Sequence, residues 1–163
     1  MPELVHDELG PTLKGVVLGS IDEATRRGAT KVESEHLLLS IAASGDLASA
    51  TLAEVGLDHD AIDEALRVER ANSLASAGVE PVADERLRAV RDARPGWGAS
   101  IRESLSRANF HSRRGRPRAE RERLAVADAL VGVLRAEVGT VPRALAYAGV
   151  DRAALIARLE ALR

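Results

Sequence analysis

The sequence predicts an all-α fold made of two tandem pseudo-repeats of about four helices each, joined by a linker with an extra helix. Of its 163 residues, 45% are hydrophobic but only 2% are aromatic, so the core must be built from Leu, Ala, Val and Ile. Ala, Leu, Arg and Glu are among the residues that cost least to hold in a helix. Nowhere does the sequence show the convincing alternation of apolar and polar residues that marks a half-buried strand.

A short motif that occurs twice indicates the duplication. The segment Leu52–Asp58 (LAEVGLD) returns 93 residues later as Leu145–Asp151 (LAYAGVD). A chain that repeats itself once is typical of two copies of one structural unit. We therefore expect a first repeat over residues 1–70, a linker over 71–96 and a second repeat over 97–163, together forming one compact domain.

Apolar residues at helical spacing predict four helices in the first repeat, of which the first covers residues of about 11–27. Short polar side chains accept hydrogen bonds from the first N–H groups of a helix. We therefore expect Ser34 to cap the second helix, Asp46 the third and Asp58 the fourth. Gly56 supplies the left-handed residue that ends the third helix.

The linker and the second repeat have fewer clear markers. Residues 71–81 have the composition of a linker, and an extra helix is expected after them, from apolar residues that recur at Ala83, Leu87 and Val90. In the second repeat the clearest caps are Thr140 and Asp151.

Composition excludes several classes of protein. The chain has no cysteine, which excludes disulfides, thiol catalysis and zinc–thiolate sites and fits a reducing compartment. Its start is acidic and lacks the apolar run of a signal peptide, and no stretch approaches the ~18 apolar residues of a membrane helix. We expect a cytoplasmic protein that does not act at a membrane. The net charge of −2 gives no general reason to expect nucleic acid as a partner.

The segment Val32–Ile41 (VESEHLLLSI), followed by Leu52–Asp58, resembles part of a known family. It is similar to the N-terminal repeat domain of the Clp ATPases, the bacterial protein-unfolding chaperones, whose usual string is Gly-Thr-Glu-His-Ile/Leu-Leu-Leu-Gly-Leu. That domain consists of two tandem four-helix repeats. The resemblance covers nearly the whole chain, is strong in the first repeat and is weak in the second, where Ala127 and Asp128 replace Glu-His.

The resemblance implies a binding site at Glu35, with Ser34 and His36 beside it. In the family this domain binds substrates and adaptors, and in some members a Glu at the position of Glu35 holds the guanidinium of phosphorylated arginine. A carboxylate can accept a bidentate pair from a guanidinium, and a helix N-terminus can hold a phosphate. On the alternative interpretation, Glu35 only complements the helix dipole and His36 packs and hydrogen-bonds locally. Ala127 gives no reason to expect a second, equivalent site.

The sequence lacks the Gly-x-x-x-x-Gly-Lys-Ser/Thr loop of an ATPase, and its four histidines form no metal-binding pattern. We therefore expect a stand-alone, non-catalytic protein- or peptide-binding module, with no cofactor and no metal, linked to Clp-dependent unfolding and proteolysis. The expected partners are a Clp ATPase, an adaptor or client proteins. The sequence predicts no particular oligomeric state.

An arginine-rich segment supports an alternative function. Its Arg-Gly-Arg-Pro core resembles the AT-hook, an extended segment that inserts arginine into the narrow minor groove of A·T-rich DNA. On this alternative the chain is a nucleic-acid-binding regulator. Two other interpretations stay open, namely a solvated loop with i, i+4 ion pairs and a loop that docks on an acidic protein. The residues concerned are Arg113, Arg114, Arg116 and Arg118.

Overall fold

A computed structural model describes residues 11–80, 82–83, 86, 94–108, 110 and 114–162. Within these ranges the chain forms eight helices, so the prediction of an all-α fold with two sets of four helices is confirmed. The first set is α2 (Pro11–Arg26), α3 (Ser34–Ala42), α4 (Leu47–Glu54) and α5 (His59–Ser76). The second set is α7 (Ala99–Arg107), α8 (Arg118–Leu134), α9 (Thr140–Tyr147) and α10 (Arg152–Glu160).

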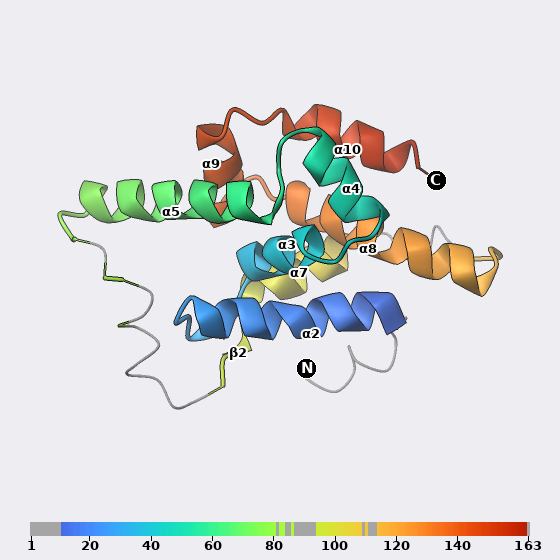
Figure 1. The fold of residues 1–163 in the computed structure, drawn as a ribbon, viewed down its shortest axis with the longest axis horizontal. Coiled ribbons are helices and arrows are strands. Elements are labelled where there is room, and N and C mark those ends of the chain that lie inside the picture. The colour runs from blue at the N-terminus through green and yellow to red at the C-terminus, as the bar shows by residue number, and fades with distance from the viewer. Residues whose placement is uncertain are drawn as a thin grey trace.

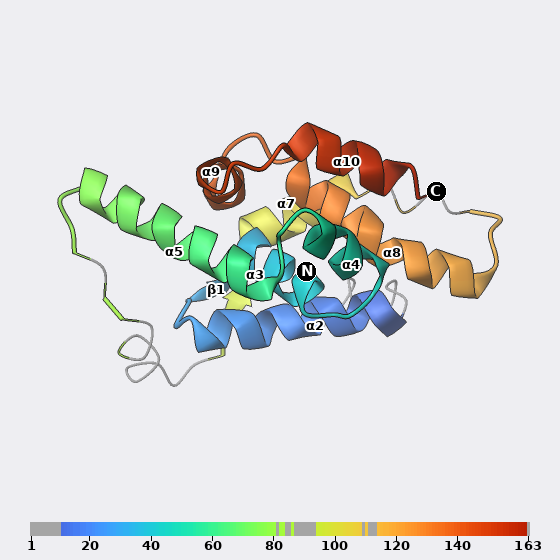
Figure 2. The same cartoon turned by 45° about the horizontal axis from the view of Figure 1, so that its top comes forward.

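The two sets interlock around a shared core (Figures 1 and 2). Helices α3 and α8 lie at the centre, and each contacts helices of both sets. Every residue from Leu124 to Leu134 is buried, as expected for a helix that is surrounded on all sides. The outer helices cross over between the sets, because α5 packs on α9 and α4 packs on α10.

Three of the predicted helix caps are confirmed. Asp46 Oδ1 accepts a hydrogen bond from the backbone N–H of Ser49 at 3.1 Å. Asp58 and Asp151 make the same contact at the starts of α5 and α10, at 2.8 and 3.0 Å. Gly56 follows α4 with φ of +78°, the left-handed conformation predicted for it.

Two predicted caps are wrong by one residue. The cap of α3 is Glu33, whose backbone is extended, and Ser34 is already the first helical residue. The cap of α9 is Gly139, which reaches a φ of +113° that a side chain disfavours, and Thr140 follows it as the first helical residue. In both cases the predicted cap is the first residue of the helix, and the residue before it takes the cap position.

The expectation that the chain has no strands needs a small correction. Strands β1 (Lys31–Val32) and β2 (Gly96–Trp97) pair in parallel, with Val32 opposite Trp97. The backbone N–H of Gly98 extends the pairing by donating to the Val32 carbonyl at 2.9 Å. Strands of two residues are too short to show an alternating pattern in the sequence. Their pairing nevertheless brings the starts of α3 and α7 together.

The segment expected to be a linker is partly helical. Helix α5 continues to Ser76, and Ser73 Oγ supports this end by donating to the Glu69 carboxylate at 2.6 Å. Residues 71–76, which were expected to belong to the linker, are therefore helical. The extra helix expected around Leu87 and Val90 lies outside the described residues.

No single helix in the described ranges is long and apolar enough to cross a membrane. Helices α3 and α4 reach the length and apolar composition of a membrane span only when they are taken together, and they are bent by 92° relative to each other.

Candidate functional site

The start of α3 is held by a reciprocal cap between Glu33 and His36. The backbone N–H of Glu33 donates to His36 Nδ1 at 2.9 Å, and the backbone N–H of His36 donates to the Glu33 side chain. His36 is only 3% exposed, and its pKa is lowered to about 4, first by burial and second by the nearby Arg27. The ring is therefore neutral at pH 7 and accepts a local hydrogen bond, as the local interpretation of this histidine predicts.

The Glu33 carboxylate also binds the start of α7. Its Oε2 accepts hydrogen bonds from the Ser100 backbone N–H at 2.9 Å and from Ser100 Oγ at 2.6 Å. Ser100 Oγ in turn accepts a hydrogen bond from the backbone N–H of Ser34 at 2.9 Å. A β-carbon on Gly98 would overlap the Glu33 carboxylate, so a side chain there would displace the carboxylate from its present position. One carboxylate thus joins the N-termini of two helices from different halves of the chain.

Sequence reasoning missed Glu33, Gly98 and Ser100. The spacing of Glu33 and His36 was a usable signal, because it is a capping box with unusual residues at both positions. The contact with Ser100 had no local signal, since the two residues are 67 positions apart.

Glu35 lies in the first turn of α3 and is half-buried. Burial raises the pKa of its carboxyl group, and the carboxylates of Glu33 and Glu69 raise it further. The hydrogen bond with its own backbone and the nearby Arg27 act in the opposite direction. Glu35 is therefore a carboxylate partly removed from water, close to two other carboxylates and one guanidinium.

Two other partly or fully buried carboxylates, Glu69 and Asp63, differ from Glu35 in having arginine partners. Glu69, which is 4% exposed, accepts hydrogen bonds from Arg143 Nε at 2.9 Å and from Ser73. Asp63 forms ion pairs with Arg27 and Arg67. Among the residues that the structure describes, the Glu35 carboxylate has no ion pair and no hydrogen bond with another residue.

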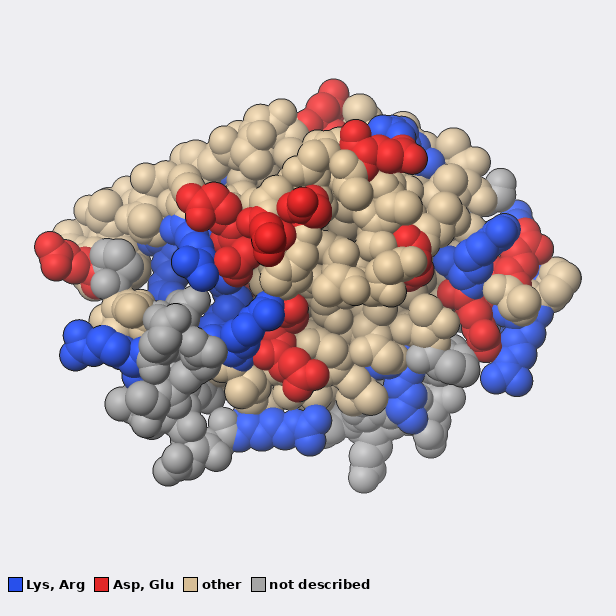
Figure 3. Space-filling view, in the orientation of Figure 1, with Lys and Arg blue, Asp and Glu red and all other residues tan. Residues whose placement is uncertain are grey.

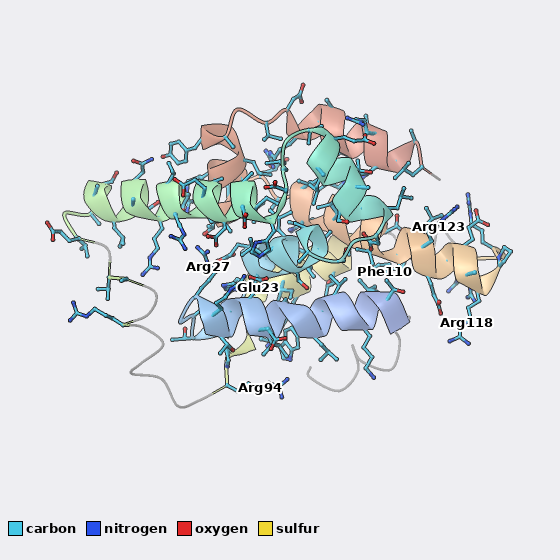
Figure 4. The ribbon with its side chains drawn as sticks, in the orientation of Figure 1. Glu23, Arg27, Arg94, Phe110, Arg118 and Arg123 are labelled. Atoms are coloured by element: carbon cyan, nitrogen blue, oxygen red, sulfur yellow. The ribbon has the colours of Figure 1, made fainter. Side chains whose placement is uncertain are left out.

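The surroundings of this site are crowded with charge. Figure 4 shows Glu23 and Arg27 at the end of α2, facing α3 and α5. Glu23 binds Arg26 and lies 3.0 Å from His59 Nε2 at the start of α5. In the space-filling view, acidic and basic side chains lie next to one another over this region (Figure 3). A ligand that reaches Glu35 therefore meets groups of both signs.

The described part of the second half of the chain has no counterpart of this site. Ala127 and Asp128, which replace Glu-His, are 3% and 2% exposed and lie in the interior of α8. The position in α8 that corresponds to the first residue of α3 lies more than two turns inside the helix, because α8 begins at Arg118. There is no helix terminus and no exposed carboxylate at the equivalent place.

The arginine-rich segment is only partly extended. Arg113 lies outside the described residues, and Arg114 is exposed just before α8. Arg116 forms an i, i+4 ion pair with Glu120. Arg118 is the first residue of α8, and its Nε donates to Glu122 Oε1 at 2.9 Å, which raises the pKa of the guanidinium. These are the ion pairs of the solvated-loop interpretation, whereas an AT-hook would require an extended chain.

No group of three or more His, Cys, Asp or Glu side chains in the described ranges could hold a metal ion. The candidate site is therefore the start of α3, where the charges come from the side chains themselves. A half-buried carboxylate such as Glu35 is able to pair with a cationic group.

Two crossed sets of four helices around α3 and α8 are the architecture of a Clp-type N-terminal domain. The chain is similar to the crystal structure of the N-terminal domain of the caseinolytic protease associated chaperone ClpD from Arabidopsis thaliana. The TM-score is 0.64, the sequence identity is 19%, and the match covers 99% of this chain and 97% of the other. No protein-family model matches the sequence, and neither does any curated protein. The similarity therefore shows the fold, and the function has to be argued from the site.

Proposed function

We propose that this chain is a non-catalytic protein- or peptide-binding module that recognises substrates or adaptors for a Clp-type unfoldase. The fold supports this proposal, because the similar structure is the N-terminal domain of a protease-associated chaperone. The expected partners are accordingly a Clp ATPase, an adaptor or client proteins.

The observation that carries the proposal is the state of Glu35. It is a half-buried carboxylate whose pKa is raised by burial and by two nearby carboxylates, and among the described residues it lacks the arginine partner that Glu69 and Asp63 each have. Placing a guanidinium against Glu35 would replace its lost hydration with a charge-assisted, bidentate pair. The favoured ligand is therefore an arginine side chain of another protein, which is also the group that the resemblance implies.

Phosphorylation of that arginine is the more specific part of the proposal. The backbone N–H groups at the start of α3 are already engaged, because Ser34 N–H donates to Ser100 and His36 N–H donates to Glu33. The Glu35 carboxylate accepts a hydrogen bond from its own backbone. A phosphate would thus need another cation, and Arg27 is the one whose charge reaches Glu35.

The test measures binding of three peptides that differ only at one residue, which is arginine, phosphoarginine or glutamine. Glu35→Gln should weaken binding of the arginine-containing peptides at least tenfold, since it removes a charged partner worth about 1.5–3 kcal/mol. Glu64→Gln is the matched control, because Glu64 is an exposed glutamate on α5. Equal affinities of the two variants would remove Glu35 from the site.

A native pull-down with and without nuclease tests the wider proposal. Recovery of Clp ATPase subunits that survives nuclease would support an unfoldase-linked module. Recovery dominated by nucleic acid would instead support the alternative of a regulator that uses Arg114, Arg116 and Arg118. Under that alternative, affinity for DNA should fall steeply with salt.

A further inference from the structure

The start of α8 projects beyond the rest of the fold. With Ala127 in the place of Glu35, Ser34 corresponds to position 126, but α8 already begins at Arg118. None of residues 118–123 is buried, and Leu124 is the first buried residue of the helix. In Figures 1 and 2 this end of α8 extends from the core on the side opposite to the free end of α5. Burial in the core therefore does not explain why the chain has this extra helix.

The projecting segment, residues 114–123, is strongly basic and is called the basic projection below. Five arginines and two glutamates give it a net charge of +3, in a chain whose total is −2. The arginines are Arg114, Arg116, Arg118, Arg121 and Arg123, and the glutamates are Glu120 and Glu122. So much positive charge is concentrated on a segment with almost no apolar surface.

Glu120 in the first turn of α8 complements the helix dipole, but the arginine in the same turn does not. Positive side chains in a first turn oppose the helix dipole, and Arg118 occupies that turn. The ion pair of Arg118 with Glu122 has the basic residue first, which is the less favourable order for an i, i+4 pair. An anionic partner would relieve both effects, so the arrangement favours binding over local stability.

Arg118 can bind a further carboxylate without losing its present contact. Arg118 and Arg121 are three residues apart and therefore share one face of α8. Arg118 donates to Glu122 through Nε, which leaves four of the five N–H donors of its guanidinium for another acceptor. Figure 4 shows Arg118 and Arg123 extending from opposite sides of the helix, so positive charge is offered on more than one side.

The glutamates decide which kind of anion fits. A DNA strand carries one phosphate for about every 3.4 Å of the duplex axis and so brings negative charge to Glu120 and Glu122 when it follows α8. A peptide can place its carboxylates opposite the arginines and neutral residues opposite the glutamates. Carboxylates also match the planar guanidinium in a bidentate pair. We propose that the basic projection is a docking surface for an acidic segment of a partner protein.

The test uses a fluorescent peptide of alternating Glu and Ser, a matched peptide of Gln and Ser, and an A·T-rich DNA duplex. The double variant Arg118→Gln/Arg121→Gln should bind the acidic peptide about tenfold more weakly, because it removes two charge-assisted contacts. Glu122→Gln should bind it about threefold more tightly, since it releases Arg118 from its ion pair and removes a negative charge.

The control variant is Lys14→Gln/Arg102→Gln, which removes two exposed positive charges elsewhere. It should stay within about twofold of the wild type, because exposed charges far apart are screened by salt. Equal losses in the control and the test variant would overturn the proposal, as would equal binding of the two peptides or tighter binding of the duplex. An unchanged melting temperature shows that each variant is folded. Neither pair of substitutions touches Glu35, so this test is independent of the proposed function.

Discussion

The crossing of α7 and α8 gives the sharpest prediction about stability. Gly132 lies inside α8, where a β-carbon would overlap the carbonyl oxygen of Ser104 on α7. It would also lie 3.1 Å from the backbone nitrogen of Ala108. Backbone atoms cannot turn aside as a flexible side chain can. Gly132→Ala must therefore push the two helices apart.

The magnitude follows from the separation that the new atom requires. Carbon–oxygen contacts shorter than about 3.3 Å are not normally found, so the helices must separate by about 1 Å. A gap of that size loses up to half of the dispersion energy across the contact, and overpacking of this kind costs about 1–3 kcal/mol. Arg107 Nε, which donates to the Gly132 carbonyl at 3.0 Å, would also be displaced. The gain in helix propensity from alanine, at most about 1 kcal/mol, offsets only part of the loss.

Gly15→Ala is the matched control, because Gly15 is an exposed residue inside α2 with no atom near its β-carbon position. It should stabilise the protein by about 0.5–1 kcal/mol. Urea titration and thermal melting, both followed by far-UV circular dichroism, would measure the two effects. For a chain of this length we expect Gly132→Ala to lower the melting temperature by about 3–10 °C. A Gly132→Ala protein as stable as the wild type would refute the close crossing of these helices.

Two further predictions concern the start of α3. The pKa of His36 in the folded state is about 4, which lies below its unfolded value of 6.5. Between these two pH values the unfolded state therefore binds more protons than the folded state. The free energy of unfolding should fall by up to about 3 kcal/mol as the pH drops from 6.5 to 4. The raised pKa of Glu35 acts in the opposite sense at the acidic end of this range. His36→Gln retains an acceptor for the cap and should flatten the dependence of the unfolding free energy, measured in urea, on pH between pH 7 and 5. An unchanged slope of this dependence would show that another group titrates. Ser100→Ala should cost about 1–2 kcal/mol in urea unfolding, because it removes one donor to the Glu33 carboxylate and the acceptor of Ser34 N–H. The control variant Ser76→Ala, at the exposed end of α5, should change the free energy of unfolding by less than about 0.5 kcal/mol. Equal effects of the two serine variants would mean that the Ser100 contact between α3 and α7 contributes nothing to stability.

Much of the fold could be predicted because its signals are local. The caps Asp46, Asp58 and Asp151 each bind an N–H group three residues along the chain, so neighbouring residues identify them. The site prediction was less complete. It named Glu35 through a resemblance, but it assigned Ser34 the capping role that Glu33 performs. The Arg27 guanidinium and the Glu69 carboxylate that act on Glu35 lie outside α3, and no pattern near Glu35 indicates them.

By itself the sequence determined the helical class, the approximate number of helices, three of the five caps predicted from it and the duplication. These depend on residue preferences and on spacings of a few residues, which act before the chain is folded. Only the tertiary structure decided that α5 packs on α9, that Glu33 joins α3 to α7, and that α8 extends to Arg118. Such features depend on contacts between residues far apart in the chain, which form only when the packed core brings them together. The partly buried state of Glu35, on which the proposed function rests, belongs to this second group.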